Sequence, residues 1–300
     1  PPPERVEPRW IPRRPPGGLR LHAGEALRRT SLPGRALSGA AQALRRPERA
    51  FEQSRRAATG LVETLGKAFS PASDTPLNVP IGPHRRFDWT RMDLDAVREV
   101  RTRVGGTVND VALACVAGAM RDWLAARGVE LEGIDFRALV PVSTRSAGQR
   151  GKLGNRVSML MARLPLDEPD PPRRLARVID ETSKLKASGQ VQGGAVLEEI
   201  SDWTVAGLLT TINRLAAARR AFNLVVTNVP GPQFPVFLNG ARLLASYPLV
   251  PLFENQALGV ATLGYAGALY WGFDADWDAL PDLHDFVLAV ESEFELLGKL

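Results

Sequence analysis

Residues 107–117 read Thr-Val-Asn-Asp-Val-Ala-Leu-Ala-Cys-Val-Ala, and the expected architecture builds outward from them. Thr107 and Asp110, three residues apart, have the spacing of a capping box, which satisfies free N–H groups where a helix begins. The seven residues from Val111 onward are apolar all round, which is typical of a helix buried in a core. We therefore expect a central helix that begins after Thr107.

Further helices follow from apolar spacing and from proline and glycine positions. A short amphipathic helix over 94–104 is predicted to end at Gly105-Gly106. Asp170-Pro171-Pro172 predicts a charged helix that runs to about residue 187, because proline is favoured in the first turn. Two more helices are expected, one over 194–219 and one opening at Pro281.

Five apolar runs have the length and composition of strands. They are residues 136–142, 157–164, 224–227, 259–265 and 268–273. Residues 70–88 are rich in proline and glycine, so we expect them to be irregular. Because strands and helices mix without a regular alternation, the predicted fold class is α/β with a mixed sheet covered by helices.

The first part of the chain has a different character. Residues 1–20 contain seven prolines, which predicts an extended connector, and we place a proline- and arginine-rich linker at 1–35. Apolar residues seven positions apart predict a connecting helical segment over 36–75. The main lobe is then expected over 76–300. Because connectors join domains, we expect another domain to precede this linker.

The distribution of charge argues against one class of function, nucleic-acid binding. The net charge of +5 is uneven, since residues 1–60 hold 13 arginines and 5 glutamates and the remainder carries −3. Without interleaved aromatic residues or a known motif, this basicity does not indicate nucleic-acid binding. It fits a solvated helical face, and the alternative is weak attraction to anionic lipid.

Cysteine usage and hydropathy suggest where the protein works. Cys115 is the single cysteine, which excludes an internal disulfide framework and a multi-cysteine metal site and fits a reducing compartment. The stretch that opens with Pro1 lacks the apolar core of a signal peptide. No run of about 18 apolar residues predicts a membrane span. The expected location is the cytoplasm.

Most catalytic arrangements can be tested against three histidines. His22 lies in the predicted connector, His84 in a loop, and His284 within the last helix beside Asp285. His284 is most simply a partly exposed helix residue, and His84, the least easily dismissed of the three, has no identifiable serine, cysteine or carboxylate partner in the sequence. G-x-S-x-G, P-loop, G-x-G-x-x-G and H-E-x-x-H motifs are absent. A self-contained catalytic site is therefore not predicted.

Three polar or small-residue motifs each have a structural and a functional interpretation. Asn109 and Asp110 either cap the central helix or border an active site at its start. The Asn228–Pro232 stretch is either a simple turn or a rigid wall of a ligand tunnel. Tyr265-Ala266-Gly267 and Gly272-Phe273 suit a tight hairpin or the close approach of an acyl chain to the backbone.

Read together and in order, six strings resemble the bacterial wax ester synthase/diacylglycerol acyltransferase (WS/DGAT) family over about residues 77–297. They are Leu77-Asn78-Val79-Pro80-Ile81-Gly82-Pro83-His84-Arg85-Arg86-Phe87, Gly106-Thr107-Val108-Asn109-Asp110-Val111-Ala112-Leu113-Ala114, Val140-Pro141-Val142-Ser143-Thr144-Arg145, Leu153-Gly154-Asn155-Arg156-Val157-Ser158, Thr227-Asn228-Val229-Pro230-Gly231-Pro232, and Tyr265-Ala266-Gly267 with Gly272-Phe273 and Asp276. One departure is Gly264, where the family often has serine.

The resemblance implies a lobe of the chloramphenicol-acetyltransferase-like fold of CoA-dependent acyltransferases. The family's H-H-x-x-x-D-G motif, whose second histidine acts as general base, does not occur in this sequence. The chain therefore resembles the C-terminal portion of the family, and its expected partner is an N-terminal lobe of the same gene product, present in the same or a separate chain. No cofactor is expected, because acyl-CoA is the substrate and a diacylglycerol or long-chain alcohol the acceptor.

The resemblance also implies roles at matching positions. Asn109 and Asp110 correspond to an Asn-Asp motif that supports the catalytic region. Contacts with acyl-CoA are expected from Ser143, Thr144, Arg145 and Asn155, and a tunnel lining from Asn228, Gly231, Gly240 and Ala241. No metal site is expected. Peripheral association with a membrane or lipid-droplet surface is expected because the products would be triacylglycerol or wax esters.

Two alternatives stay open. The chain could be a non-catalytic lipid-binding or scaffold module that keeps the fold without the histidine motif. It could also be an acyltransferase of the same fold with another acceptor, such as a peptide-condensing or polyketide-releasing enzyme.

Overall fold

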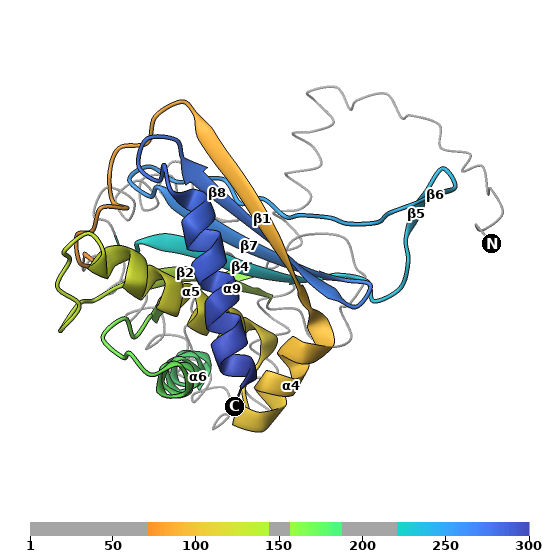
Figure 1. The fold of residues 1–300 in the computed structure, drawn as a ribbon, viewed down its shortest axis with the longest axis horizontal. Coiled ribbons are helices and arrows are strands. Elements are labelled where there is room, and N and C mark those ends of the chain that lie inside the picture. Colours follow the sequence, from red (N-terminus) through yellow and green to blue (C-terminus); the bar gives the residue numbers. More distant parts are fainter. Residues whose placement is uncertain (1–70, 144–156, 188–220, 300) are drawn as a thin grey trace, which may run out of the picture. The chain divides into compact units, whose positions relative to one another are not determined.

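The computed structural model describes residues 71–143, 157–187 and 221–299 (Figure 1). The predicted linker at 1–35, nearly all of the helical segment at 36–75 and the helix at 194–219 lie outside these ranges. Residues 71–75 are described and form no helix. The domain boundaries therefore stay predictions.

One six-stranded sheet organises the described residues, with the strand order β1-β8-β7-β4-β2-β3. Its pairing is mixed, because β2, β4 and β7 are parallel to one another while β3 and β8 run antiparallel to their neighbours. The predicted mixed sheet is confirmed. The strands are β1 (Arg85–Asp93), β2 (Arg137–Ser143), β3 (Val157–Arg163), β4 (Leu224–Pro230), β7 (Leu258–Tyr265) and β8 (Ala268–Asp276).

The helices confirm the sequence predictions closely. They are α4 (Leu94–Val104), α5 (Val108–Ala125), α6 (Pro171–Ala187) and α9 (Leu283–Gly298). Gly105 ends α4 in the left-handed conformation with φ of 76°, which glycine adopts without strain. Thr107 caps α5 through the predicted capping box with Asp110.

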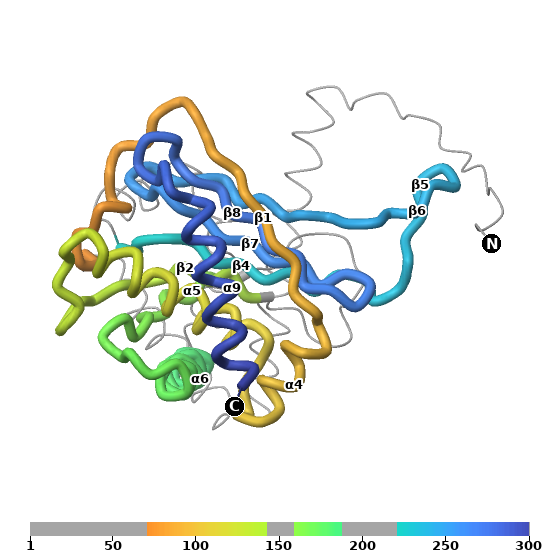
Figure 2. Tube along the Cα trace, viewed as in Figure 1, coloured from red at the N-terminus to blue at the C-terminus, as the bar shows by residue number. Residues whose placement is uncertain are grey.

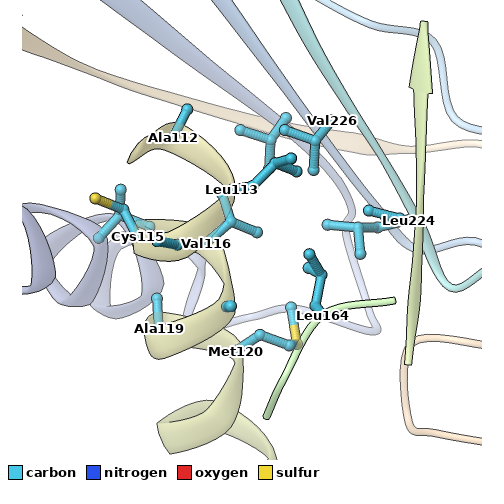
Figure 3. Packing of buried hydrophobic residues seen from close by; sticks show 14 of the residues in the cluster. Ala112, Leu113, Cys115, Val116, Ala119, Met120, Leu164, Leu224 and Val226 are labelled. Atoms are coloured by element: carbon cyan, nitrogen blue, oxygen red, sulfur yellow. The ribbon is translucent and has the colours of Figure 1, made fainter. Parts of the chain in front are cut away.

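Helix α5 lies at the centre of the apolar core. Its side chains are buried almost continuously from Asp110 to Met120, and Figure 3 shows Leu113 beside Val226 of β4 and Met120 beside Leu164. Helix α5 packs against β4 of the sheet on one side and contacts α6 and α9 on others, which explains why its sequence is apolar all round rather than along one stripe.

A buried ion pair joins the helices around α5. Glu293 of α9 is bonded to Arg174 of α6, whose side chain is 1% exposed. A Cβ atom at Gly118 of α5 would lie 2.1 Å from the Glu293 carboxyl carbon, so this glycine makes room for the carboxylate. Arg174 also donates to the carbonyl of Glu168 at 2.8 Å. Position 118 therefore tolerates no side chain without displacing a buried charge.

Two strand predictions need correction. Arg85–Asp88 were expected to be irregular, but they open β1, which pairs with β8 along its whole length. β1 is an edge strand whose exposed positions alternate with less exposed ones. Its many charged residues interrupt the apolar run from which a strand is predicted. The predicted turn at 228–232 is wrong for its first three residues, because β4 continues beside β7 as far as Pro230.

The hairpin between β7 and β8 is confirmed. Ala266 and Gly267 have φ values of 46° and 84°, and Tyr265 pairs with Ala268 across the turn. Positive φ at both central residues is the geometry that matches the twist of two-residue hairpins. Trp271 and Phe273 of β8 face the helices, since Phe273 contacts Phe286 of α9 edge to face.

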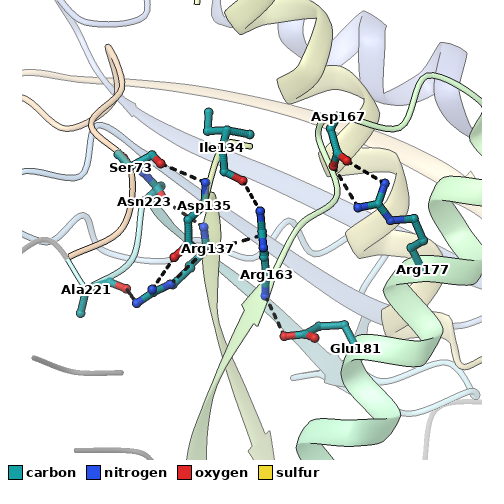
Figure 4. A network of polar contacts seen from close by, with 10 residues as sticks. All are labelled: Ser73, Ile134, Asp135, Arg137, Arg163, Asp167, Arg177, Glu181, Ala221 and Asn223. Atoms are coloured by element: carbon teal, nitrogen blue, oxygen red, sulfur yellow. Dashed lines mark hydrogen bonds and ion pairs between the residues drawn. The ribbon is translucent and has the colours of Figure 1, made fainter. Parts of the chain in front are cut away.

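A polar network holds the start of β2 and β4 (Figure 4). The side chain of Asn223 accepts a hydrogen bond from the Arg137 N–H at 2.8 Å and donates to the Ser73 carbonyl at 2.8 Å. Arg163 of β3 donates to the Ile134 carbonyl at 2.9 Å. These bonds satisfy buried backbone groups and attach the segment before β1 to the sheet.

Residues 232–246, which we call the arm, leave the sheet as a long hairpin (Figure 2). The arm carries two short antiparallel strands, β5 (Phe237–Leu238) and β6 (Ala241–Arg242). Its apolar side chains are exposed, with Leu238 at 77% and Leu244 at 78%. Arg242 is its one charged residue. The arm therefore presents an apolar, nearly uncharged surface.

Gly118→Ala is expected to destabilise the protein by about 2–5 kcal/mol, because the methyl group would overpack the helix junction and push Glu293 away from Arg174. The free energy of unfolding in urea measures this. Gly298→Ala in α9 is the matched control, since a Cβ there meets nothing within 4 Å, and its effect should stay within about 1 kcal/mol. Equal losses in the two variants would contradict this account of Gly118.

Candidate active-site edge

Four strands end at one edge of the sheet. β2, β4 and β7 are mutually parallel, and β1 points the same way because both β1 and β7 are antiparallel to β8. We call the edge where these four strands end the carboxyl edge. In open α/β sheets, ligands bind outside the carboxyl ends of parallel strands. The carboxyl edge is therefore the first place to look for a site.

The start of α5 faces this edge. Along β4, Leu224 precedes Val226, and Figure 3 shows Leu113 near the level of Val226 and Val116 nearer the level of Leu224, with Met120 farther along in the same direction. Helix α5 thus runs opposite to β4, and its N-terminal turn points toward the carboxyl edge. Free backbone N–H groups and the positive end of the helix dipole accompany that turn.

Asp110 is committed to structure. One carboxylate oxygen, Oδ2, accepts from the Thr107 backbone N–H at 2.8 Å and from the Thr107 hydroxyl at 2.7 Å. The other, Oδ1, accepts from the Thr182 hydroxyl of α6 at 2.8 Å. With Asp110 2% exposed and both oxygens bonded, its role is to hold the helix end in place.

Asn109, by contrast, keeps its side-chain amide available. It is half-buried at the first turn of α5. Within the described ranges its amide has no hydrogen-bond partner. An amide both donates and accepts, so Asn109 can orient a hydroxyl or a carbonyl that reaches the carboxyl edge. The two residues of the motif thus differ in what they can do chemically.

Asn228 lies on the helix-facing side of β4. Leu224 and Val226 pack into the core with α5, and alternation along the strand directs Asn228 to the same side. Its Oδ1 accepts a hydrogen bond from the Thr262 hydroxyl of β7 at 3.0 Å. Asn228 is therefore a fixed polar group near the end of β4. It lies close to the carboxyl edge, toward which the first turn of α5 points.

The four predicted tunnel residues do not gather at one place. Gly231 follows β4, where a Cβ atom would lie 2.4 Å from the Gly264 carbonyl oxygen, so close approach to β7 requires glycine. Gly240, with φ of 84°, and Ala241 belong to the exposed turn of the arm. Asn228 and Gly231 are neighbours, whereas Gly240 and Ala241 lie in the arm.

The predicted acyl-CoA contacts are mostly outside the described residues. Ser143 ends β2 at the carboxyl edge, and Thr144, Arg145 and Asn155 lie in the range 144–156. Pairing between β2 and β4 covers Ala138 and Leu139 on the β2 side. The role of all four residues stays a prediction.

The described histidines lie away from the carboxyl edge. His84 precedes β1, and so lies at the opposite edge of the sheet. His284, at the start of α9, is exposed and has Nδ1 2.7 Å from Oδ2 of Asp88 in β1. Sequence patterns missed this partner because Asp88 is 196 positions away. His22 lies outside the described residues.

Cys115 has no nucleophilic role in this geometry. It is fully buried in α5. Burial in the apolar core, reinforced by the nearby Glu293 carboxylate, raises the pKa of its thiol far above the ordinary value. A thiol that stays protonated is a small apolar core residue.

Comparison with models of known protein families identifies the family of this chain. The family model described as "WS/DGAT C-terminal domain" matches residues 153–298. The model described as "Wax ester synthase/diacylglycerol acyltransferase catalytic domain" matches residues 1–112. The chain belongs to the WS/DGAT family. The two matches together cover most of the sequence, including both the α5 start and the carboxyl ends of β4 and β7.

Named relatives agree with this membership. A probable diacylglycerol O-acyltransferase of Mycobacterium tuberculosis is 37% identical over 244 residues, which is 79% of this chain and 51% of that protein. The O-acyltransferase WSD of Acinetobacter baylyi is 33% identical, over 73% of this chain and 48% of that protein. The chain thus spans about half the length of the curated relatives it matches.

Solved structures confirm the expected acyltransferase fold. The wax ester synthase/diacylglycerol acyltransferase of Marinobacter aquaeolei superimposes with a TM-score of 0.60 at 26% identity, covering 85% of this chain and 58% of that one. The cyclization-docking bidomain of a nonribosomal peptide synthetase from Sorangium cellulosum gives 0.54 at 15% identity, over 82% of this chain and 49% of that one. The second likeness concerns the fold alone.

No helix in residues 71–143, 157–187 or 221–299 combines the length and apolarity that crossing a bilayer requires.

The His284–Asp88 pair predicts a pH dependence of stability. Its hydrogen bond and charge raise the pKa of His284 above 6.5, and Asp285 and Glu291 add weaker attraction. The pair therefore stabilises the fold below about pH 6.5, and this contribution is lost as pH rises through the raised pKa. Thermal unfolding of His284→Gln should show a deficit in acid that disappears in alkali.

The matched control for that measurement is His84→Gln. The His84 side chain is exposed and has no hydrogen bond within the described residues. Its substitution should leave the pH profile of wild type intact. A deficit for His284→Gln that is independent of pH would contradict the ion-pair interpretation.

Proposed function

We propose that this chain is the portion of an acyl-CoA-dependent O-acyltransferase that supplies the Asn-Asp helix end and the carboxyl edge of the second lobe. The reaction would form triacylglycerol, wax esters or both. The observation that carries the proposal is the match to two WS/DGAT family models over most of the chain, with relatives named as diacylglycerol O-acyltransferases. The structure adds support, because Asn109 is available where ligands are expected.

The proposed chemistry is general-base acyl transfer. A histidine takes the proton of an alcohol or diacylglycerol hydroxyl, the oxygen attacks the thioester carbonyl of acyl-CoA, and CoA leaves as a thiol after receiving that proton. The H-H-x-x-x-D-G motif that would supply this base does not occur in the sequence. We therefore propose that the base belongs to a first lobe that works together with this chain.

Asn109 is proposed to orient a reacting group at the carboxyl edge, while Asp110 supports it structurally. Asn228 and Gly231 are proposed to form one wall of the substrate tunnel. Gly240 and Ala241 can reach substrate only if the arm does so. Ser143, Thr144, Arg145 and Asn155 are proposed to contact acyl-CoA, since an arginine can pair with its phosphates.

The arm supports the proposal of a protein partner. Its strands are two residues long, which leaves many backbone N–H and C=O groups unpaired within it. Burying such groups in hydrocarbon would be costly, because lipid offers them no hydrogen bonds. A protein surface with a free strand edge satisfies both the backbone and the apolar side chains. We propose the first lobe as that partner.

Diacylglycerols and wax alcohols are poorly soluble in water, so we also propose that the assembled enzyme works at a membrane or lipid-droplet surface. Flotation of the two-lobed protein with diacylglycerol-containing vesicles tests this. Recovery of the protein wholly in the vesicle-free fraction would contradict it.

A second candidate is a non-catalytic lipid-binding or scaffold module. The observation that favours it is that neither described histidine lies at the carboxyl edge. An acyltransferase with a peptide or polyketide acceptor is a third, and acceptor profiling distinguishes it. The structural likeness to peptide synthetase domains bears on the fold and does not favour that acceptor.

The decisive assay measures transfer from palmitoyl-CoA to a diacylglycerol and to hexadecanol. The 300-residue chain alone should be inactive, and a polypeptide that also contains the H-H-x-x-x-D-G lobe should be active. Activity of the chain alone would refute the composite site. Inactivity of both, with folded protein and bound lipid, would favour the scaffold reading.

Within the active polypeptide, Asn109→Ala is expected to lower kcat by about 10–100-fold, because a misplaced reacting group loses orientation. Its thermal unfolding should match wild type within about 0.5 kcal/mol, since the removed amide has no described partner. Steady-state kinetics and thermal melts are both needed. Unchanged kcat would contradict the proposed orienting role of Asn109.

A further inference from the structure

Two polar contacts join helix α6 to the central helix, one directly and one through Glu293 of α9. Thr182 donates its hydroxyl to Oδ1 of Asp110 at 2.8 Å, with both side chains buried. Arg174 is bonded to Glu293, whose carboxylate fills the notch at Gly118. Apolar residues of α6 fill the space between, namely Leu175, Val178 and Leu185.

The two contacts define a single axial register. On α5, Gly118 follows Asp110 by eight residues, and on α6, Arg174 precedes Thr182 by eight residues. The helices therefore run antiparallel and meet both contacts at once. A slide of α5 by one turn, about 5.4 Å, would break both. It would separate the buried Asp110 carboxylate from Thr182 and bring a residue with a side chain opposite Glu293, where only the glycine at 118 leaves room, and both changes are unfavourable.

We propose that Thr182 is a positioning residue for Asn109. It touches neither substrate nor reacting atoms. By holding the carboxylate next to Asn109, it fixes the height and direction of the first turn of α5 at the carboxyl edge. This inference rests on the proposed function, because the orientation of Asn109 matters for turnover only if acyl transfer occurs there.

The Thr182 hydroxyl is the group through which α6 holds the start of α5. Oδ2 of Asp110 is already occupied by Thr107, so the capping box forms without α6. Among the described residues, the Thr182 hydroxyl is the group that donates to Oδ1. Without that donor a buried oxygen lacks its hydrogen bond. The helix end can then regain one only by moving toward water, and Asn109 moves with it.

The test uses the two-lobed acyltransferase and three variants. Thr182→Val keeps the shape and removes the hydroxyl, and Thr182→Ser keeps the hydroxyl and removes the methyl group. Ser183→Ala is the matched control, because Ser183 is the exposed neighbour on the same helix. Kinetics with palmitoyl-CoA and diacylglycerol are combined with hydrogen exchange at the amides of residues 108–110.

We expect Thr182→Val to lower kcat by about tenfold or more with KM for palmitoyl-CoA nearly unchanged, and to speed exchange at residues 108–110. Thr182→Ser should keep kcat and the exchange rate at residues 108–110 close to those of wild type, and Ser183→Ala should match wild type. Loss of kcat in Thr182→Ser equal to that in Thr182→Val would overturn the proposal. So would wild-type exchange at residues 108–110 in Thr182→Val.

Exchange separates this inference from the proposed function. If the two-lobed wild type transfers no acyl group, the proposed function fails. Faster exchange at residues 108–110 in Thr182→Val, reversed in Thr182→Ser, would still show that α6 positions the end of α5. If Thr182→Val does not fold, the kinetics and exchange of Thr182→Ser against Ser183→Ala decide, and a defect in Thr182→Ser overturns the role of the hydroxyl.

Discussion

The carboxylate of Glu293 occupies the space that a side chain at residue 118 would fill, and the Arg174 guanidinium meets it there. Burial raises the pKa of Glu293, against the opposing pull of Arg174. A charge removed from water in this way is tolerated only with its partner in place. Three helices, α5, α6 and α9, therefore reach their final positions together, and the core of the lobe depends on that arrangement.

That arrangement also fixes where helix α5 begins relative to the carboxyl edge. The buried residues of α5 after Asp110 are apolar and many of them are small, so apolar packing alone would specify the axial position of the helix weakly. The polar contacts at Gly118 and Asp110 supply the missing specificity. As a result the half-buried amide of Asn109 has a defined place beside strands whose ends carry Asn228, itself held by Thr262.

The arm depends on the sheet in a similar way. The Tyr265 hydroxyl accepts from the Val236 N–H at 3.0 Å and donates to the Leu243 carbonyl at 2.9 Å. The Tyr270 hydroxyl donates to the Leu244 carbonyl at 3.1 Å. Buried rings with polar tips thus anchor both sides of the arm at its base. These bonds fix the base of an otherwise exposed apolar hairpin to the sheet.

Local sequence by itself determined the capped start of α5, the end of α4 at Gly105 and the tight turn at Ala266-Gly267, because those features rest on neighbours within a few residues. It also contained the family strings. The edge strand β1, the His284–Asp88 pair and the Thr182–Asp110 bond were decided by tertiary structure alone. Their partners lie 72 to 196 positions apart, and only folding brings such distant residues within hydrogen-bonding reach.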